Sequence, residues 1–281
     1  MFRIRIFLFF APFLFLNCSD NNAPEPEDDV LPVESPRLSD EELLDITQRQ
    51  TFKYFWEFAH PASGLIRERG RLSKGPTGVV TIGGTGFGLM TILVAIERGF
   101  ISREEGLDRL LNMVIFLDEK ANKYHGAFSH WLDGETGETI PFSPNDDGGD
   151  LVETAFLVQG LLTVRQYFDG NNEAEEKIRD LINKLWNNVE WDWYTQGGRE
   201  GLFWHWSPNF GWEKNHRISG WNEALIVYVL AAASQHHGIQ ASVYHNGWAR
   251  SGAMVNGKTF YGHPLPLGKD LGGPLFFAHY S

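Results

Sequence analysis

The stretch "SPNDDGGDLVETAFLVQGLL" (143–162) contains four acids and then becomes almost wholly apolar. The apolar run continues to Phe168 and predicts a helix over 150–168 that is buried on several sides. Asp150 is a good N-cap for this helix, and Glu153 at N3 can complete a capping pair and suits the helix dipole. This structural role leaves Asp146 and Asp147 unexplained. Carboxyl groups this close also raise one another's pKa, as an acid–base site requires, so both interpretations stay open.

The segments around this helix alternate in character. Segments 86–99 and 219–234 are also apolar nearly all round, whereas 102–120 and 173–186 carry apolar residues on one face only. Such alternation is expected of two layers of helical hairpins, in which inner helices contact several neighbours and outer helices bury one face. No βαβ alternation appears, so the sequence predicts an all-α fold.

Local signals predict where individual helices begin. Ser39 with Glu42, and Ser102 with Glu105, have the spacing of capping boxes, and Pro61 would stop the first helix near residue 60. The glycines of "TIGGTGFG" (81–88) lack the third glycine of a dinucleotide-binding loop. We expect them to form a loop that enters a tightly packed helix.

The N-terminal residues are typical of an exported protein. A short basic region precedes an apolar run at 6–16 that is too short to span a bilayer, and the only cysteine, Cys18, follows at once. A single cysteine in this position resembles the lipid-attachment cysteine of bacterial lipoproteins, although Asn17 stands where a small residue is usual. We expect a signal peptide at 1–18, an acidic, proline-rich linker at 19–38, and a lipid anchor to the outer membrane, facing the periplasm or the cell surface.

Composition narrows the class of ligand. The net charge of −12 argues against nucleic acid and disfavours polyanions. Histidines show no metal-ligand spacing, so no metal or cofactor is expected. Seven of the ten tryptophans fall between 186 and 221, mostly in a glycine-containing loop region, where aromatic side chains indicate a binding surface. Aromatic rings stack on the C–H faces of sugars, which favours a neutral oligosaccharide.

Glu223 is a second candidate acid. It lies near the start of the apolar segment 219–234, where a first-turn acid is favoured by the helix dipole. At the end of an inner helix, beside Trp221 and Asn222, it would also point into a central cavity. Apolar and aromatic neighbours would raise its pKa, as a general acid requires.

Four segments carry a resemblance to a known family: "TFKYFWEFAHPASGLIRER" (51–69), "GGTGFGLMTILVAIERGFISREE" (83–105), "GWNEALIVYVLAAAS" (220–234) and "GGPLFFAHYS" (272–281). They resemble the glycoamylase-like family, which includes the endo-β-1,2-glucanases of glycoside hydrolase family 144, often Bacteroidetes lipoproteins. The resemblance implies an (α/α)6 toroid over 39–281. Family members continue beyond the "HYS" motif, so we expect the C-terminal part of the toroid to be missing here.

The resemblance also implies a site and an activity. Its D-x-x-x-D-x-x-E spacing falls on Asp146, Asp150 and Glu153, and the glutamate of its N-E-A motif is Glu223. We expect a monomeric hydrolase of a neutral glucan, with β-1,2-glucan as substrate and Glu223 as general acid. The other three acids would position the water or bind sugar hydroxyls. The residues expected to bind substrate are Trp131, Trp204, Trp206, Trp212, Trp221 and Asn222.

Two other functions fit the sequence. A surface lipoprotein that binds glycans without catalysis would keep the tryptophans. A polysaccharide lyase on a similar toroid would need Arg or Lys to neutralise a uronate, which the acid-rich motifs and the −12 charge disfavour.

Overall fold

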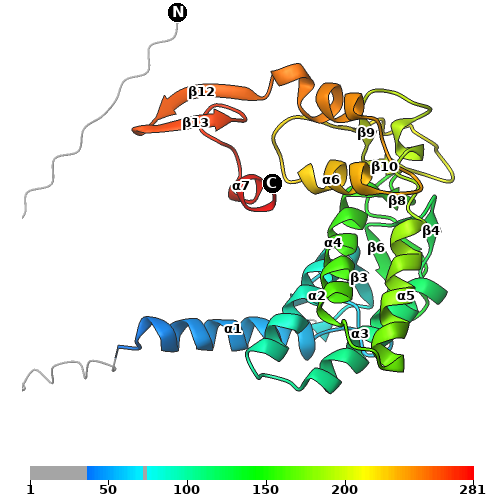
Figure 1. The fold of residues 1–281 in the computed structure, drawn as a ribbon, viewed down its shortest axis with the longest axis vertical. Coiled ribbons are helices and arrows are strands. Elements are labelled where there is room, and N and C mark those ends of the chain that lie inside the picture. The colour runs from blue at the N-terminus through cyan, green and yellow to red at the C-terminus, as the bar shows by residue number, and fades with distance from the viewer. Residues whose placement is uncertain (1–36, 72–74) are drawn as a thin grey trace, which may run out of the picture. The chain divides into compact units, whose positions relative to one another are not determined.

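The computed structural model describes residues 37–71 and 75–281 (Figure 1). Cys18 and nearly all of the expected linker lie outside this part of the chain. Contacts divide the chain into two units, Met1–Leu43 and Leu44–Ser281. The described residues of the first unit begin the first helix, where Ser39 and Glu42 form the predicted capping box: the Glu42 amide donates to Ser39 Oγ at 3.3 Å, and the Ser39 amide donates to Glu42 Oε2 at 2.8 Å.

Helices dominate the described residues, as predicted. They are α1 (Asp40–Trp56), α2 (Ile82–Glu97), α3 (Arg103–Glu119), α4 (Leu151–Tyr167), α5 (Glu173–Asn187), α6 (Leu225–Ala233) and α7 (Leu275–Tyr280). The capping box of Ser102 and Glu105 is present at the start of α3. α1 ends four residues before the expected stop, and α6 is shorter than expected at its N-terminal end.

The prediction of a purely helical fold was incomplete, because short antiparallel strands connect the helices. Most are two or three residues long, too short to be recognised by alternation of apolar and polar residues. They are β1 (Gly70–Arg71), β2 (Gly75–Pro76), β3 (Val79–Thr81), β4 (Lys123–Tyr124), β5 (Ala127–Phe128), β6 (Trp131–Asp133), β7 (Thr139–Ile140), β8 (Gly149–Asp150), β9 (Leu202–Phe203), β10 (His205–Trp206), β11 (Arg217–Ile218), β12 (Val255–Phe260) and β13 (His263–Leu267).

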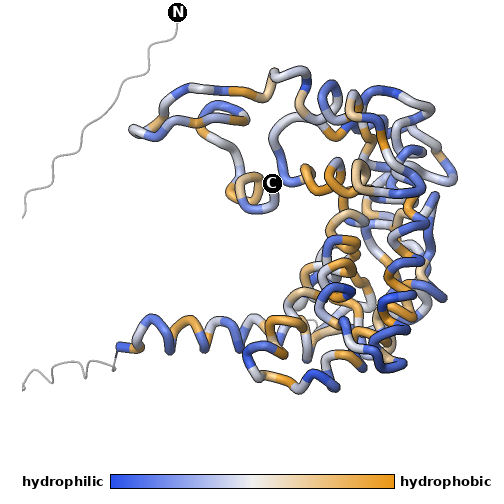
Figure 2. Tube along the Cα trace, in the orientation of Figure 1, coloured by the Kyte–Doolittle hydropathy of each residue, from blue (hydrophilic) through white to orange (hydrophobic). Residues whose placement is uncertain are grey.

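Apolar helices form one layer of the second unit. α2 packs on α4 and α4 on α6, while the amphipathic α3 and α5 pack on each other (Figure 1). Hydrophobic residues run almost continuously along α6, whereas they alternate with hydrophilic ones along α5 (Figure 2). Two buried clusters fill the interior, one among α2 to α5 and one between α4, α6 and the loops after α5. Within the described residues, no helix is long and apolar enough to cross a membrane.

The glycines at 83–88 do not form the expected loop, because α2 already begins at Ile82. Two glycines are instead required by the close packing of α2 on α4. A side chain at Gly86 would collide with the backbone carbonyl of Phe156 on α4, and one at Gly160 would collide with the carbonyl of Gly86. Only glycine at these two positions lets the helix backbones approach so closely.

Candidate active site

A pair of short strands holds the acidic loop against a distant part of the chain. β8 pairs with β10, so that Asp150 lies opposite His205 and Gly149 opposite Trp206. The side chain of Asp147 also holds the acidic loop against the segment that contains β10. It accepts hydrogen bonds from Ser207 Oγ and from Asn209 Nδ2, the latter at 2.6 Å. These bonds outweigh burial and lower the pKa of Asp147. Asp147 therefore has a structural role in fastening the loop.

Asp150 is both a helix cap and a wall of the site. Its Oδ1 accepts hydrogen bonds from the amides of Val152 at 3.0 Å and Glu153 at 2.9 Å, as predicted for an N-cap. Its other oxygen, Oδ2, lies 3.0 Å from Nδ1 of His130. Only 2% of Asp150 is exposed. Burial alone would lower the pKa of His130, but its hydrogen bond to Asp150 and the charge of that carboxylate outweigh this and raise it.

Asp146 is surrounded by positive and polar groups. Lys214 Nζ lies 3.1 Å from Oδ2, and His205 Nε2 lies 3.1 Å from Oδ1. The imidazole is within ion-pair distance but is not aligned for a hydrogen bond. Both ring nitrogens of the buried His205 thus lack a hydrogen-bond partner in the part of the chain that the structure describes. Burial lowers the pKa of His205.

Asp146 and Asp150 line a cavity of about 290 Å³. Two pairs of stacked rings form part of its wall: His130 on Phe142, with centroids 4.0 Å apart, and Trp204 on His216, 5.0 Å apart. Such a small polar cavity with aromatic sides suits one or two sugar units. Its lining residues are His130, Phe142, Asp146, Asp150, Trp204, His205, Lys214 and His216.

Glu153 lies one helical turn beyond Asp150, on the side of α4 that faces α2. Its Oε2 accepts a hydrogen bond of 2.9 Å from the amide of Gly83 at the start of α2. The expected capping pair is therefore absent, because the carboxylate reaches a neighbouring helix. Burial, followed by the charge of Asp150, raises the pKa of Glu153 to about 7. This side chain is a protonated carboxylic acid under mildly acidic conditions.

The raised pKa predicts a pH-dependent stability. The folded protein keeps the Glu153 proton up to about pH 7, whereas an unfolded chain loses it near the ordinary value of 4.5. The stabilisation is thus fully present below pH 4.5 and is lost as the pH rises through 7. We expect the free energy of unfolding of the wild type, relative to Glu153→Gln, to fall by on the order of 3 kcal/mol between pH 4 and 8. Urea unfolding followed by tryptophan fluorescence measures this, and parallel pH profiles would contradict it.

Like Glu153, Glu223 is not among the residues that line the acid cavity. It lies in a turn before α6, since the helix begins only at Leu225, and its half-buried side chain makes no hydrogen bond or ion pair with the other described residues. Asn222 has a local structural role, because its Oδ1 accepts from the amide of Ala224 at 2.9 Å.

Contacts of α7 nevertheless link the Glu223 turn to the N-terminal ends of α2 and α4. Tyr280 contacts the rings of Phe87 on α2 and Phe156 on α4, with centroids 5.2 and 5.6 Å apart. The hydroxyl of the adjacent Ser281 donates to the carbonyl of Asn222 and accepts from the amide of Leu225. Phe156 lies one turn beyond Glu153, so the two glutamates belong to the same end of this helix layer.

The structure separates the predicted tryptophans into groups. Trp204 lines the cavity, and Trp131 lies behind it, 4.8 Å from the ring of Phe142. Trp221 packs against the core. Trp206 and Trp212 do not line the cavity. In strand β10 successive residues point to opposite faces, so Trp206 faces away from the acids that His205 faces.

Sequence reasoning missed five cavity residues: His130, Phe142, His205, Lys214 and His216. Histidines were considered only as metal ligands, and their spacing gave no sign of that role. One local signal was available. The alternation of Trp204, His205 and Trp206 in a short hairpin could have indicated that the histidine and Trp206 serve different faces.

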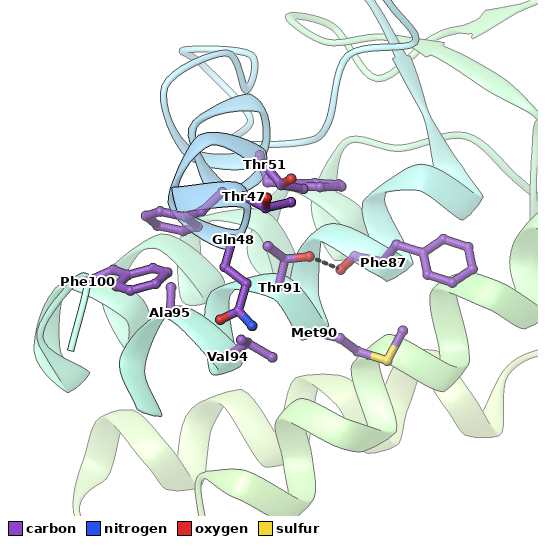
Figure 3. Close-up of a pocket in the computed structure, with 11 residues that line it drawn as sticks. Thr47, Gln48, Thr51, Phe87, Met90, Thr91, Val94, Ala95 and Phe100 are labelled. Atoms are coloured by element: carbon purple, nitrogen blue, oxygen red, sulfur yellow. Dashed lines mark hydrogen bonds between the residues drawn. The ribbon is translucent and has the colours of Figure 1, made fainter. Parts of the chain in front are cut away.

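A larger cavity lies elsewhere and is apolar. A groove of about 480 Å³ between α1 and α2 is lined by residues including Phe52, Phe87, Met90, Val94 and Phe100. Figure 3 shows these side chains gathered around the groove, with the hydroxyl of Thr91 donating to the carbonyl of Phe87. Val94 is 51% exposed. The groove has no acid for catalysis, so the smaller polar cavity is the candidate active site.

Comparisons with known proteins agree on one family. The family model "Glycoamylase", described as "Putative glucoamylase", matches residues 215–281. A relative from Parabacteroides distasonis named exo β-1,2-glucooligosaccharide sophorohydrolase (non-reducing end) is 49% identical over 87% of this chain and 36% of its own. A solved endo-β-1,2-glucanase from Chitinophaga pinensis, in complex with sophorotriose and glucose, is 52% identical with a TM-score of 0.84, covering 87% of this chain and 60% of that one. A β-1,2-glucanase structure from Parabacteroides distasonis is 48% identical with a TM-score of 0.81, covering 87% and 37%. The chain thus spans between 36% and 60% of the length of these relatives.

Proposed function

Because the chain belongs to the glycoamylase-like family, we propose that it hydrolyses a neutral glucan, namely β-1,2-glucan, with Glu153 as the general acid. The observation that carries the proposal is the raised pKa of Glu153, about 7, one helical turn from a carboxylate that stays hydrogen-bonded to three groups. A buried carboxylic acid with a raised pKa beside a second carboxyl group is typical of glycosidases. The names of the relatives support the linkage.

The proposed reaction divides the work among the acids. Glu153 donates its proton to the glycosidic oxygen as the bond to the anomeric carbon breaks, through an oxocarbenium-like transition state. Asp146 and Asp150 provide negative charge near that carbon, and their partners Lys214 and His130 hold them in place. The unpartnered nitrogens of His205 are available to sugar hydroxyls. Glu223, which has no partner among the described side chains, is assigned as the base: it takes a proton from the water whose oxygen forms the new bond to the anomeric carbon.

This assignment differs from the sequence-based one, which made Glu223 the acid. A general acid must hold a proton near neutral pH, and the surroundings of Glu153 give a physical cause for that: burial and the adjacent charge of Asp150. A lyase is disfavoured by the same cavity, since its lysine, Lys214, is already paired with Asp146 and cannot neutralise a uronate.

We also propose that α2, α4 and α6 are inner helices of an (α/α)6 toroid and that α3 and α5 are outer ones. The apolar layer, and the approach of the N-terminal ends of these three helices through Glu153, Tyr280 and Ser281, support this arrangement. The lipid anchor at Cys18, the outer-membrane location and the monomeric state stay predictions of the sequence.

A substrate screen tests the function. We expect the purified chain to release reducing sugar from linear β-1,2-glucan and not from β-1,3-, β-1,4- or α-1,4-glucans, with calorimetry run beside the reducing-sugar assay. Binding of β-1,2-glucan without any release of sugar would favour the non-catalytic binding lipoprotein instead. Release from another glucan alone would refute the proposed linkage.

A further inference from the structure

A second aromatic surface lies on the far side of the β8–β10 ladder from the acids. We call it the aromatic patch and define it as His125, Trp193, Trp206 and Trp212. His125 stacks on Trp193 with ring centroids 3.8 Å apart and an angle of 15°, and Trp206 meets the edges of both rings. Trp212 lies 6.3 Å from Trp193. Four rings from three separate segments thus meet outside the cavity.

Trp193 is the exposed member of the patch, with 39% of its surface open. Because His125 covers one face of the indole, the open surface belongs to the other face and the ring edges. The backbone of Trp193 is also held in place. Asp192 Oδ1 caps the short 3-10 helix Trp193–Thr195 by accepting from the amide of Trp193 at 3.1 Å. A large apolar ring fixed at the surface has lost its conformational entropy before any ligand arrives, which favours binding.

The hairpin that carries His125 is built to present it. His125 and Gly126 connect β4 to β5, and both have positive φ values of 52° and 75°, as a two-residue hairpin turn requires. A side chain at Gly126 would collide with the carbonyl of Asn188. The imidazole is fixed from the other side by Glu190, whose Oε2 lies 2.9 Å from Nδ1. The stack on Trp193 is therefore preformed.

The rim of the patch supplies acceptors of hydrogen bonds. Glu190 and Asp192 each use one carboxylate oxygen for a histidine, and their second oxygens, Oε1 and Oδ2, have no hydrogen-bond partner among the described residues. Sugar hydroxyls are donors that match such oxygens, whereas a polyanion would be repelled. An apolar ring with carboxylates beside it fits a neutral, hydroxyl-rich chain.

We propose that the aromatic patch is a second binding site for the glucan, outside the acid cavity. The inference rests on the proposed function for the identity of the sugar. Strand β10 joins the two sites, since His205 faces the cavity and the next residue, Trp206, belongs to the patch. A polymer bound at both sites would gain affinity from the second contact, which a short oligosaccharide that fills only the cavity would not.

The test compares polymer and oligosaccharide binding. Isothermal calorimetry with linear β-1,2-glucan should show a loss of affinity of about tenfold for Trp193→Ala, the size typical of a central tryptophan anchor. Trp193→Phe keeps an aromatic ring and should recover part of this loss, which guards against a merely misfolded variant. Tyr261→Ala removes another exposed ring, 93% open on the β12–β13 turn, and should bind as the wild type does.

Each outcome separates the patch from the catalytic proposal. Unchanged polymer affinity in Trp193→Ala overturns the patch, and so does an equal loss for a β-1,2-linked disaccharide, a size that the cavity alone can hold. The patch is also overturned if Trp193→Ala lowers the affinity for a proline-rich peptide but leaves the affinity for glucan unchanged. If the wild type releases no sugar but still binds polymer through Trp193, the hydrolase proposal fails and the patch stands.

Discussion

Glu153→Gln is expected to lower turnover of β-1,2-glucan by about 10²- to 10⁴-fold, the usual contribution of a general acid. Glutamine keeps the shape of the side chain and can still accept from the amide of Gly83, but it has no proton to give to the leaving oxygen. Glucan affinity should persist, because the cavity walls are unchanged. Initial rates and calorimetry on the same preparations separate the two quantities.

Glu119→Gln is a matched control for this variant, since Glu119 is an exposed residue at the end of α3. Its turnover should equal that of the wild type. In the wild type, turnover should also decline as the pH rises through about 7, because the acid then loses its proton. If Glu153→Gln keeps its rate while Glu223→Gln loses it, the acid is Glu223, as the sequence first indicated.

Gly86→Ala is expected to destabilise the protein by about 3 kcal/mol, although alanine favours helices over glycine by about 1 kcal/mol. The new methyl group would meet the backbone of Phe156, which cannot move away as a flexible side chain could. The two helices would have to separate, and they share the core. Thermal or urea unfolding measures the loss.

Gly160→Ala should cause a loss of similar size from the other side of the same contact, and the double variant should lose less than the sum, because one separation of α2 and α4 relieves both collisions. Gly78→Ala is the control. Its methyl group would meet only Asp133 at 3.8 Å, so a change within about 0.5 kcal/mol is expected. Equal stability of Gly86→Ala and Gly78→Ala would refute the close helix contact.

Local signals in the sequence predicted the helices well, because a cap and its helix are neighbours along the chain. Ser102 with Glu105 and the N-cap Asp150 are examples that the structure confirms. The role of Glu153 could not be read in this way. Its local spacing indicated a capping pair, and its actual partner, the amide of Gly83, is fixed only when α2 packs on α4.

For the same reason, the sequence could not predict the short strands or which tryptophans line the cavity. Pairing of Asp150 with His205 depends on contacts across distant segments, and two-residue strands leave no periodic pattern. A dense group of tryptophans indicated a binding surface, but only the folded chain shows that Trp204 lines the cavity and Trp206 contacts His125.

The pairing of β8 with β10 has a consequence for biosynthesis. A growing chain that has left the ribosome as far as α4 already contains the cap of that helix, because Asp150 needs only the amides that follow it and His130 that precedes it. The partners of Asp146 and Asp147 are made later, because they lie within residues 205 to 214. Asp146 contacts His205 and Lys214, and Asp147 accepts hydrogen bonds from Ser207 and Asn209. The acid cavity would therefore be completed late in translation, after the first helices have been made.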